Sequence, residues 1–347
     1  MSIRLLIIFL FINFSIFSII GKGRYHYSGI RNISILFCIW IVMFLISAFR
    51  PSDMPDYENY YNFLIGRNNA ERWEIGFKSY IEIFKNIHNN PIFLFAVIAA
   101  LTVGIKLLAI RKMSNSLWLS MVVYISGVFI LHDMIQIRAA AASGLLLWAT
   151  KYAYECNLKK FLIIGVVAML FHYSAIIIFP IWFISTTKTQ RWFYISLIPL
   201  SYILVSSGIV FGSLAEHIPI PTFQTLWRAY QNSMNQGLDS DINIFNTLHL
   251  LRCITCLFLL YNLNKIAIYR NISILWVKIY TISLVSLVVF SDVPVIAFRV
   301  SELLQVVEIV LIPTLVLIPS YRSIGKYMAI VFGASLLFVN TFYNNFF

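Results

Sequence analysis

The chain has 347 residues, of which 60% are hydrophobic and only 12% are charged. Soluble domains carry about 25% charged residues; with a mean hydropathy of +0.82, this composition excludes a water-soluble fold and makes the bilayer the solvent. The net charge of +12 would suggest nucleic acid in a soluble protein. Here Lys and Arg lie mainly in short loops, as in the cytoplasmic loops of membrane proteins, so we expect no nucleic-acid partner.

Long apolar segments follow one another along the chain, each near the roughly 20 residues that a membrane-spanning helix needs. The runs are continuous rather than alternating, which favours helices over β-barrel strands. Segment 3–20 lacks a small-residue cleavage site, so we expect a retained span and not a signal peptide. We predict an all-α polytopic integral membrane protein with about 10–11 transmembrane helices in a single membrane domain, 1–347. The predicted spans are 3–20, 33–49, 91–110, 117–131, 136–155, 161–184, 192–212, 246–263, 271–290, 299–318 and 325–343.

Two connections, 50–90 and 212–245, are too long to be simple turns. Long loops in compact proteins are usually functional or disordered, and the many Tyr, Trp, Phe and Ile residues in both argue against disorder. Apolar residues near helical spacing in 74–88 predict an amphipathic helix that lies in the membrane interface. Segment 222–236 is a second candidate of the same kind.

The basic residues predict the side of each loop, because cytoplasmic loops are enriched in Lys and Arg. The alternation is consistent from loop 21–32 to Lys159 and Lys160, and every later loop is then inverted. A single break corrects all of them: the sequence FHYS in the middle of 161–184 favours a broken or re-entrant helix that lines a cavity. The alternative is that the charge rule is only a bias. With the break, both long loops face the periplasm, and Lys188, Lys265, Arg270, Arg322 and Lys326 face the cytoplasm.

Charged or polar side chains within spans are functional candidates, because a charge at the centre of a bilayer costs several kcal/mol. Arg138 opens a span and is followed by four alanines, which would let another helix or a substrate approach closely. An interfacial arginine that snorkels is the alternative. His172 lies in mid-span, where a core histidine bonded to a backbone carbonyl is the alternative. Lys106 lies near the inner end of its span, where we expect it to snorkel.

A second charged group follows a proline-containing break late in the chain. Arg299 and Glu302 are three residues apart and share a helix face, so they either line a site or form an intrahelical ion pair. Glu308 lies two turns deeper, where an interfacial position no longer explains it. Arg138 and Arg299 both fall at the outer face. Because the arginine fork matches phosphate, we expect an anionic lipid headgroup and a sugar to bind there.

One pattern bears on metals. Asp239 and Asp241 flank a serine in a D-x-D sequence, which many nucleotide-sugar enzymes use to hold a divalent cation. Asp241 or Asn243 would equally cap a helix that begins near residue 244. A lipid-diphosphate donor neutralised by arginines needs no metal, and no glycine-rich phosphate loop is present. We therefore expect no metal and no other cofactor.

Five short motifs follow one another along the chain. They are Asp56-Tyr57-x-x-Tyr60, Glu74-x-Gly76-Phe77, Gln136-x-Arg138 with its alanine run, Phe171-His172-Tyr173-Ser174-Ala175, and Ala297-Phe298-Arg299 with Glu302. In this order and spacing they resemble the EpsG/Wzy-type polysaccharide (O-antigen) polymerases of bacterial envelopes. Each motif alone would often occur by chance, so the resemblance rests on their joint order, and it covers about residues 50 to 310.

The resemblance implies a location, a reaction and partners. Such polymerases lie in the bacterial inner membrane and act at its periplasmic face. They take a growing glycan from its undecaprenyl diphosphate carrier and join it to the sugar of a new lipid-linked repeat unit. Undecaprenyl-diphosphate-linked glycan repeat units and membrane lipid are therefore the expected partners, and a chain-length regulator protein is a candidate partner.

The site residues fit this glycosyl transfer, which passes through an oxocarbenium-like state. Preorganised cations stabilise a departing diphosphate, and we assign this role to Arg138 and Arg299. A carboxylate or imidazole deprotonates the acceptor hydroxyl. The candidates for this second role are Asp56, Glu74 and His172, of which His172 alternatively only shapes the site; the candidate substrate-binding residues are Arg50, Tyr57, Tyr60 and Glu302.

Three other functions are compatible with the sequence. A flippase for the same lipid-linked glycan would also need outward cations, together with a charged cavity through the membrane and usually two pseudo-symmetric halves. An acyltransferase that decorates the glycan would rest on His172 or His132. An O-antigen ligase, which moves the finished glycan to another acceptor, uses chemistry so similar that the sequence barely separates it from a polymerase.

Overall fold

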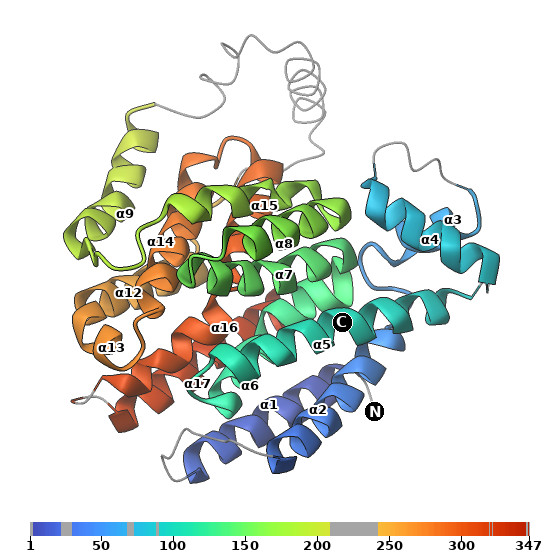
Figure 1. The fold of residues 1–347 in the computed structure, drawn as a ribbon, viewed down its shortest axis with the longest axis horizontal. Coiled ribbons are helices and arrows are strands. Elements are labelled where there is room, and N and C mark those ends of the chain that lie inside the picture. Colours follow the sequence, from blue (N-terminus) through green and yellow to red (C-terminus); the bar gives the residue numbers. More distant parts are fainter. Residues whose placement is uncertain are drawn as a thin grey trace.

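The computed structural model of the chain describes residues 3–21, 30–67, 73–87, 90–208, 242–318, 320, 322–344 and 346. Every regular element in these ranges is helical (Figure 1), which confirms the predicted all-α fold. The apolar side chains of the helices form one large buried cluster, and a smaller cluster lies under the first long loop. The predicted helix 222–236 and the D-x-D pattern lie outside the described residues.

The helices before the gap at 209–241 begin with α1 (Ile3–Ile20), α2 (Ile30–Ala48), α3 (Tyr57–Leu64), α4 (Ile75–Ile87), α5 (Pro91–Met113) and α6 (Leu117–Ser126). They continue with the π-helical η1 (Phe129–Ile135), α7 (Ile137–Tyr154), α8 (Leu158–Phe171), the 3₁₀ helix η2 (Tyr173–Phe183) and α9 (Arg191–Ser206). After the gap follow α12 (Thr247–Tyr261), α13 (Leu263–Tyr269), α14 (Ser273–Val289), α15 (Pro294–Gln305), α16 (Glu308–Leu311), η3 (Ile312–Leu317), α17 (Arg322–Phe338) and η5 (Val339–Tyr343).

The cap of α12 differs from the two candidates considered from the sequence. The side chain of Asn246 accepts a hydrogen bond from the backbone N–H of His249, so Asn246 is the N-cap and the helix begins at Thr247. Asn243 lies outside this helix, where its side chain accepts a hydrogen bond from the backbone N–H of Phe245. An Asn at this position satisfies one of the free N–H groups of the first turn.

Among the described helices, four are long and apolar enough to cross a bilayer: Ile3–Ile20, Pro91–Met113, Pro294–Leu317 and Arg322–Tyr343. Two bent pairs, α6 with η1 at 60° and α12 with α13 at 68°, raise the number to six if each pair is one span. Shorter apolar helices, including α2, α9 and α14, occupy further segments predicted as spans. The chain is a polytopic membrane protein in which several spans are broken where the sequence suggested continuous helices.

The basic loops gather at one end of the helix bundle. Their contacts join segments far apart in the chain, from the end of α1 to the start of α17. This arrangement confirms that the basic segments after residue 160 share a side with those before it, as the predicted break requires; that this side is cytoplasmic stays a prediction. The contacts are Arg270 to the carbonyl of Met113, Asn271 to Tyr154 Oη, Lys278 to the carbonyls of Ser185 and Lys188, Asn115 to the carbonyl of Pro313, and Lys326 to the carbonyl of Gly21.

The predicted break at His172 is confirmed, and it is a hairpin. Helix α8 ends at Phe171, and His172 has extended backbone angles (φ −155°, ψ 113°) before η2 begins. The ring of Phe161, near the start of α8, lies 5.2 Å from the ring of Trp182, near the end of η2. Because α8 rises only about 21 Å, short of a bilayer core of about 30 Å, the chain turns at His172 and returns to the basic end.

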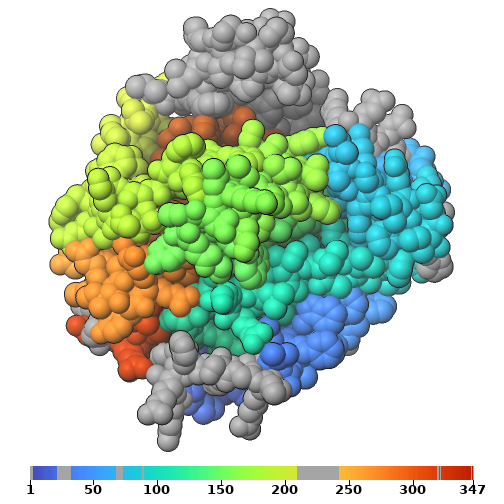
Figure 2. Space-filling model, in the orientation of Figure 1, coloured from blue at the N-terminus to red at the C-terminus, as the bar shows by residue number. Residues whose placement is uncertain are grey.

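The first long loop folds as two helices, α3 and α4, and α4 packs against this hairpin. Helix α4 confirms the helix predicted for 74–88, and it leaves Ile75, Ile83 and Ile87 exposed, an apolar face of the kind that an interfacial helix presents to lipid. On its other side, an alanine Cβ at Gly76 would lie 2.6 Å from the carbonyl oxygen of Leu170 in α8. Only glycine allows this approach. Figure 2 shows the hairpin and the first loop next to each other on one face.

A buried ion pair stabilises the break between η1 and α7. Lys106 donates to Asp133 Oδ1 and to the carbonyl of Ala140, both at 2.8 Å, and the side chains of the pair are 0% exposed. Thr102 and Tyr124 donate to the same carboxylate. The expected snorkelling of Lys106 is therefore wrong, because a carboxylate inside the bundle compensates the cost of burying the ammonium group.

Candidate active site

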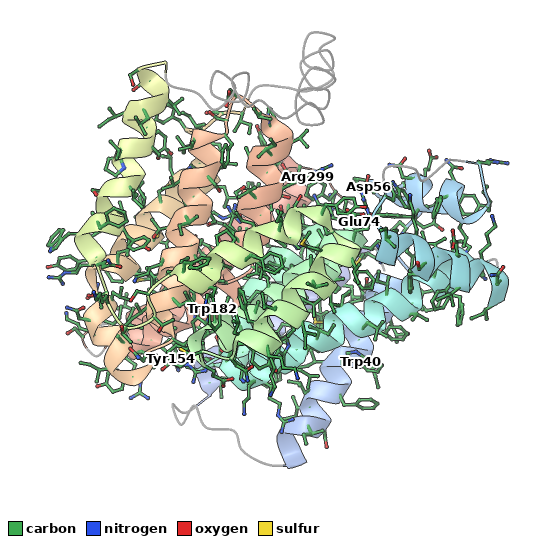
Figure 3. All side chains as sticks on the ribbon, turned by 45° about the horizontal axis from the view of Figure 1, so that its top comes forward. Trp40, Asp56, Glu74, Tyr154, Trp182 and Arg299 are labelled. Atoms are coloured by element: carbon green, nitrogen blue, oxygen red, sulfur yellow. The ribbon has the colours of Figure 1, made fainter. Side chains whose placement is uncertain are left out.

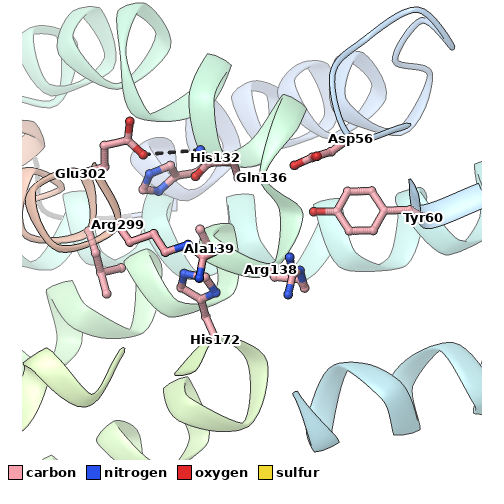
Figure 4. Close-up of a pocket in the computed structure, with 10 residues that line it drawn as sticks. Asp56, Tyr60, His132, Gln136, Arg138, Ala139, His172, Arg299 and Glu302 are labelled. Atoms are coloured by element: carbon pink, nitrogen blue, oxygen red, sulfur yellow. Dashed lines mark hydrogen bonds between the residues drawn. The ribbon is translucent and has the colours of Figure 1, made fainter. Parts of the chain in front are cut away.

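A cavity of about 110 Å³ lies where the first loop, the hairpin tip and α15 meet. In Figure 4 its walls come from α3, the break between η1 and α7, the hairpin tip and α15. Figure 3 shows Arg299, Asp56 and Glu74 near one another, at the end of the molecule away from Tyr154 and Trp182. The lining residues are Asp56, Tyr60, His132, Gln136, Arg138, Ala139, His172, Arg299, Glu302 and Leu303. Six of the nine predicted site residues thus share one cavity.

Glu74 lies behind the cavity wall and connects three elements. Its Oε2 accepts a hydrogen bond from Arg138 Nη1 at 2.8 Å. Its Oε1 accepts from the backbone N–H of Tyr173 at 3.2 Å and lies 3.3 Å from His172 Nδ1. Burial alone would raise the pKa of Glu74, but the contacts with His172 and Arg138 outweigh burial and lower it to about 2. At neutral pH Glu74 is a carboxylate, and both of its oxygens are engaged by neighbouring groups. Glu74 is therefore better suited to positioning Arg138 and the hairpin tip than to taking a proton from a substrate.

The two arginines that we predicted to stabilise the diphosphate, Arg138 and Arg299, have different surroundings. Arg138 is paired with Glu74, and its guanidinium lies 5.2 Å from the ring centre of Trp73. Within the part of the chain that the structure describes, the guanidinium of Arg299 makes neither an ion pair nor a hydrogen bond. The intrahelical pair with Glu302 is therefore not formed; Glu302 accepts a hydrogen bond from Gln136 at 3.4 Å instead. Arg299 is the cation that remains available to an anionic ligand.

Asp56 and Tyr60 face these arginines from the first loop. Asp56 precedes α3 with φ 64°, in the left-handed region that is uncommon outside glycine but accessible to Asp. Such conformations occur preferentially at functional sites. Burial and the charge of Asp56 raise the pKa of Tyr60 to about 12, so the phenol keeps its proton at neutral pH and can donate a hydrogen bond.

Arg50 and Tyr57 lie outside the set of residues that line the cavity. The Arg50 guanidinium donates to the carbonyls of Ser47, Asp133 and Met134 and lies 4.4 Å from the ring centre of Phe95. It thereby satisfies carbonyl groups that the π-helical turn leaves exposed within the bundle. The ring of Tyr57 packs at 5.1 Å from the same phenylalanine. These contacts explain both side chains structurally, without a substrate.

Two residues near the site, His132 and Arg252, were not among the site residues predicted from the sequence. His132, considered there only for acyl transfer, lines the cavity, is 1% exposed, and has an Nδ1 atom without a partner among the described residues. Arg252 pairs with Glu308 through Nε at 2.9 Å and explains why that carboxylate lies so deep. Arg252 could have been predicted from the sequence, because a charge inside the predicted span 246–263 is itself unusual.

The described residues hold no group of three or more His, Cys, Asp or Glu side chains that could bind a metal ion. A sequence model described as the EpsG family matches residues 32–347, more than the 50–310 over which the motifs are spread. No curated protein and no solved structure gave a match. The family match covers every residue of the cavity, and the chain belongs to the EpsG family.

Proposed function

We propose that this protein is a polysaccharide polymerase of the O-antigen type, a glycosyltransferase that joins undecaprenyl-diphosphate-linked repeat units at the periplasmic face of the inner membrane. Membership of the EpsG family suggests a polymerase-like role in polysaccharide biosynthesis. The observation that carries the proposal is a single cavity in which Arg138 and Arg299 face the carboxylates of Asp56 and Glu302. Transfer of a sugar from an anionic leaving group needs this combination of groups.

In the proposed reaction, an acceptor hydroxyl oxygen forms a bond to the anomeric carbon of the donor glycan. The bond from that carbon to the diphosphate oxygen breaks, and its electron pair leaves with the lipid diphosphate. Arg299 and Arg138 stabilise this charge, because preorganised cations act on charge that develops in the transition state. A carboxylate takes the hydroxyl proton. Asp56 and Glu302 line the cavity and are suited to this role, whereas both oxygens of Glu74 are engaged.

Glu74 and His172 are positioning residues in this proposal. The hairpin tip brings His172 and the backbone N–H of Tyr173 to one oxygen of Glu74, and the other oxygen fixes Arg138. Side chains that are locked in this way keep a catalytic cation at the required position. Tyr60, on the opposite wall, adds a neutral donor for a phosphate or sugar oxygen.

The charge distribution supports the proposed orientation. The basic loops lie at one end of the bundle, and cytoplasmic loops carry the excess of Lys and Arg. The cavity, with Arg299, lies at the other end (Figure 3), which is the periplasmic end in this proposal. A periplasmic site receives repeat units after they have crossed the membrane.

Deleting the gene tests the proposal. Cells that lack the protein should place a single repeat unit on their surface polysaccharide in place of a ladder, and a plasmid copy should restore the ladder. A normal ladder would contradict the proposal. Loss of a flippase would leave no repeat unit on the surface, and loss of a ligase would leave polymer on its lipid carrier, so the three functions give different products.

Arg299→Ala should lower transfer in vitro about 100- to 1,000-fold, the effect of removing one preorganised donor from a transition state. Polymer formation from purified lipid-linked repeat units measures it. Arg191→Ala is the matched control, because Arg191 begins α9 at the basic end and contacts the ring of Trp192. Wild-type activity in Arg299→Ala, with normal protein level, would remove Arg299 from the mechanism.

A further inference from the structure

A second cavity adjoins the first and is larger. Its volume is about 380 Å³, within the range of about 300–1,000 Å³ that small-molecule sites occupy, whereas the first holds about 110 Å³. His132 and Glu302 line both cavities and form the wall between them. Most of the remaining lining comes from residues 242–252, the span Pro294–Leu317 and the C-terminal end of the described chain. Gly127, Val128 and Leu131, where α6 meets η1, and Leu287 of α14 complete it.

Three buried side chains in this second cavity have hydrogen-bonding capacity that the described residues do not meet. Gln305 is 5% exposed, and its amide makes no hydrogen bond to any described residue. His132 and His249 are each 1% exposed, and their Nδ1 atoms lack partners in the described part of the chain. Since buried polar groups are almost always hydrogen-bonded in native proteins, these side chains indicate a polar ligand.

Arg252 and several amides extend the polar lining. Arg252 Nε donates to Glu308 at 2.9 Å, and neither of its Nη atoms donates to a described residue, so the outer edge of the fork is open to the cavity. The ion pair leaves this part of the cavity without net charge. Two asparagines add one donor and one acceptor of the kind that sugar hydroxyls require: Asn243 Nδ2 and Asn344 Oδ1 make no hydrogen bond to a described residue, whereas both amide atoms of Asn246 and Asn340 are engaged.

We infer that the second cavity binds the glycan of the acceptor repeat unit and presents its hydroxyl to Glu302. The inference rests on the proposed glycosyl transfer. The donor diphosphate belongs beside Arg138 and Arg299 in the first cavity, and Figure 4 shows Glu302 and His132 on the side of that cavity away from Asp56 and Tyr60. An acceptor entering past Glu302 gives its proton to this carboxylate while its oxygen bonds to the donor carbon and the lipid diphosphate leaves with the electron pair.

Charge and polarity favour a glycan over the two other parts of the substrate. An isoprenoid chain would leave Gln305, His249 and the open edge of Arg252 without hydrogen-bond partners. A diphosphate is better matched by the first cavity, where Arg299 is unpaired, than by the second, where Glu308 neutralises Arg252. A neutral or weakly charged oligosaccharide meets the requirements of the second cavity.

Photolabelling tests the location. The probe is the repeat-unit oligosaccharide, released from the lipid-linked material that accumulates in deletion cells and carrying a diazirine, added to the full-length protein in detergent. We expect label on peptides from 242–252, 298–308 or 339–344, and competition by the unlabelled oligosaccharide. Label confined to 50–67, or label on the second cavity from a diazirine-bearing isoprenyl diphosphate and none from the oligosaccharide, would overturn the inference.

The variant Gln305→Leu tests the contribution of the cavity to acceptor binding. It removes the amide at nearly constant volume and should raise the KM for the free oligosaccharide acceptor about 3- to 10-fold, the loss of one neutral hydrogen bond. The KM for the lipid-linked donor should not change. Thr314→Val is the matched control, a buried polar-to-apolar change in the same span; the hydroxyl of Thr314 bonds to the carbonyl of Leu311.

The two proposals fail in different ways. If the wild-type protein forms no polymer although the oligosaccharide labels the second cavity, the polymerase proposal fails. If the wild-type protein forms polymer while Gln305→Leu keeps the wild-type acceptor KM and the label lies elsewhere, the acceptor subsite fails and the polymerase remains. If Gln305→Leu keeps the wild-type Tm, a raised KM reflects weaker acceptor binding and not partial unfolding.

Discussion

Two ion pairs flank the same short break in the chain and differ in almost every other respect. Asp133 pairs with Lys106 before the break, and Arg138 pairs with Glu74 after it. The first pair is 0% exposed and receives two further hydroxyl donors. In the second, the Arg138 side chain is 22% exposed and lines a cavity that also holds the unpaired Arg299.

The difference separates a charge that stabilises the backbone from a charge that is available to a ligand. A buried pair with a saturated hydrogen-bond shell has no capacity for a substrate, and removing one partner leaves an uncompensated charge. A pair at a cavity edge, beside a second cation, attracts an anion. Only four residues, 134–137, therefore separate Asp133 in the structural pair from Arg138 in the candidate active site.

The largest effect is expected from Lys106→Met, which leaves Asp133 without its cation. It should destabilise the protein by about 3–5 kcal/mol, measured by denaturant unfolding in detergent, while activity per folded molecule changes little. Lys151→Met is the control, because Lys151 forms an exposed pair with Glu155, and such pairs contribute about 0.3–0.5 kcal/mol. Wild-type stability of Lys106→Met would abolish the distinction between the two pairs.

A smaller effect is expected from Gly76→Ala, which disturbs the Arg138–Glu74 pair by displacing α4, the helix that follows Glu74. The added Cβ would lie 2.6 Å from the carbonyl oxygen of Leu170, so α4 must move away from α8 at a cost of about 1–3 kcal/mol. Because Glu74 precedes α4, transfer activity should fall more than stability. Gly104→Ala is the control, since its Cβ would meet only the side chain of Trp40, at 3.3 Å. Equal losses in both variants would argue against positioning by Glu74.

The smallest effect is a pH dependence of stability. The folded-state pKa of Glu74, about 2, lies below its ordinary value of 4.5. The stabilisation by ionised Glu74 is therefore complete above pH 4.5 and is lost as the pH falls towards 2. The difference in Tm between the wild type and Glu74→Gln should shrink across this window. A constant difference would show that the Glu74 carboxylate is not held in its charged form.

Much of this architecture could be predicted from residue patterns. The apolar runs gave the helical membrane class, the FHYS sequence gave the break at His172, and spacing in 74–88 gave α4. The gathering of Asp56, Arg138 and Arg299 could not be derived from composition, because their helices are brought together by tertiary packing; it was expected through the order of the family motifs.

Other features depend on contacts that spacing does not encode. Lys106 and Asp133 lie in different elements, and each by itself looks like an interfacial charge. Arg50 looked like a ligand-binding arginine, yet the π-helical turn presents free carbonyls to it. Arg252 and Glu308 lie far apart in the chain and meet only because α12 packs against helices that follow it. In each case a distant partner decides whether a charge is structural or functional.

The hairpin at His172 has a consequence for how the protein is made. By hydropathy, residues 158–183 would be inserted as one crossing, which would place the second half of the chain on the wrong side. Lys159 and Lys160 precede the segment, and Lys188 and Arg191 follow it, so both flanks resist translocation. With the hairpin, Arg299 and Arg138 line one cavity on the same side of the membrane, whereas a single crossing would separate them.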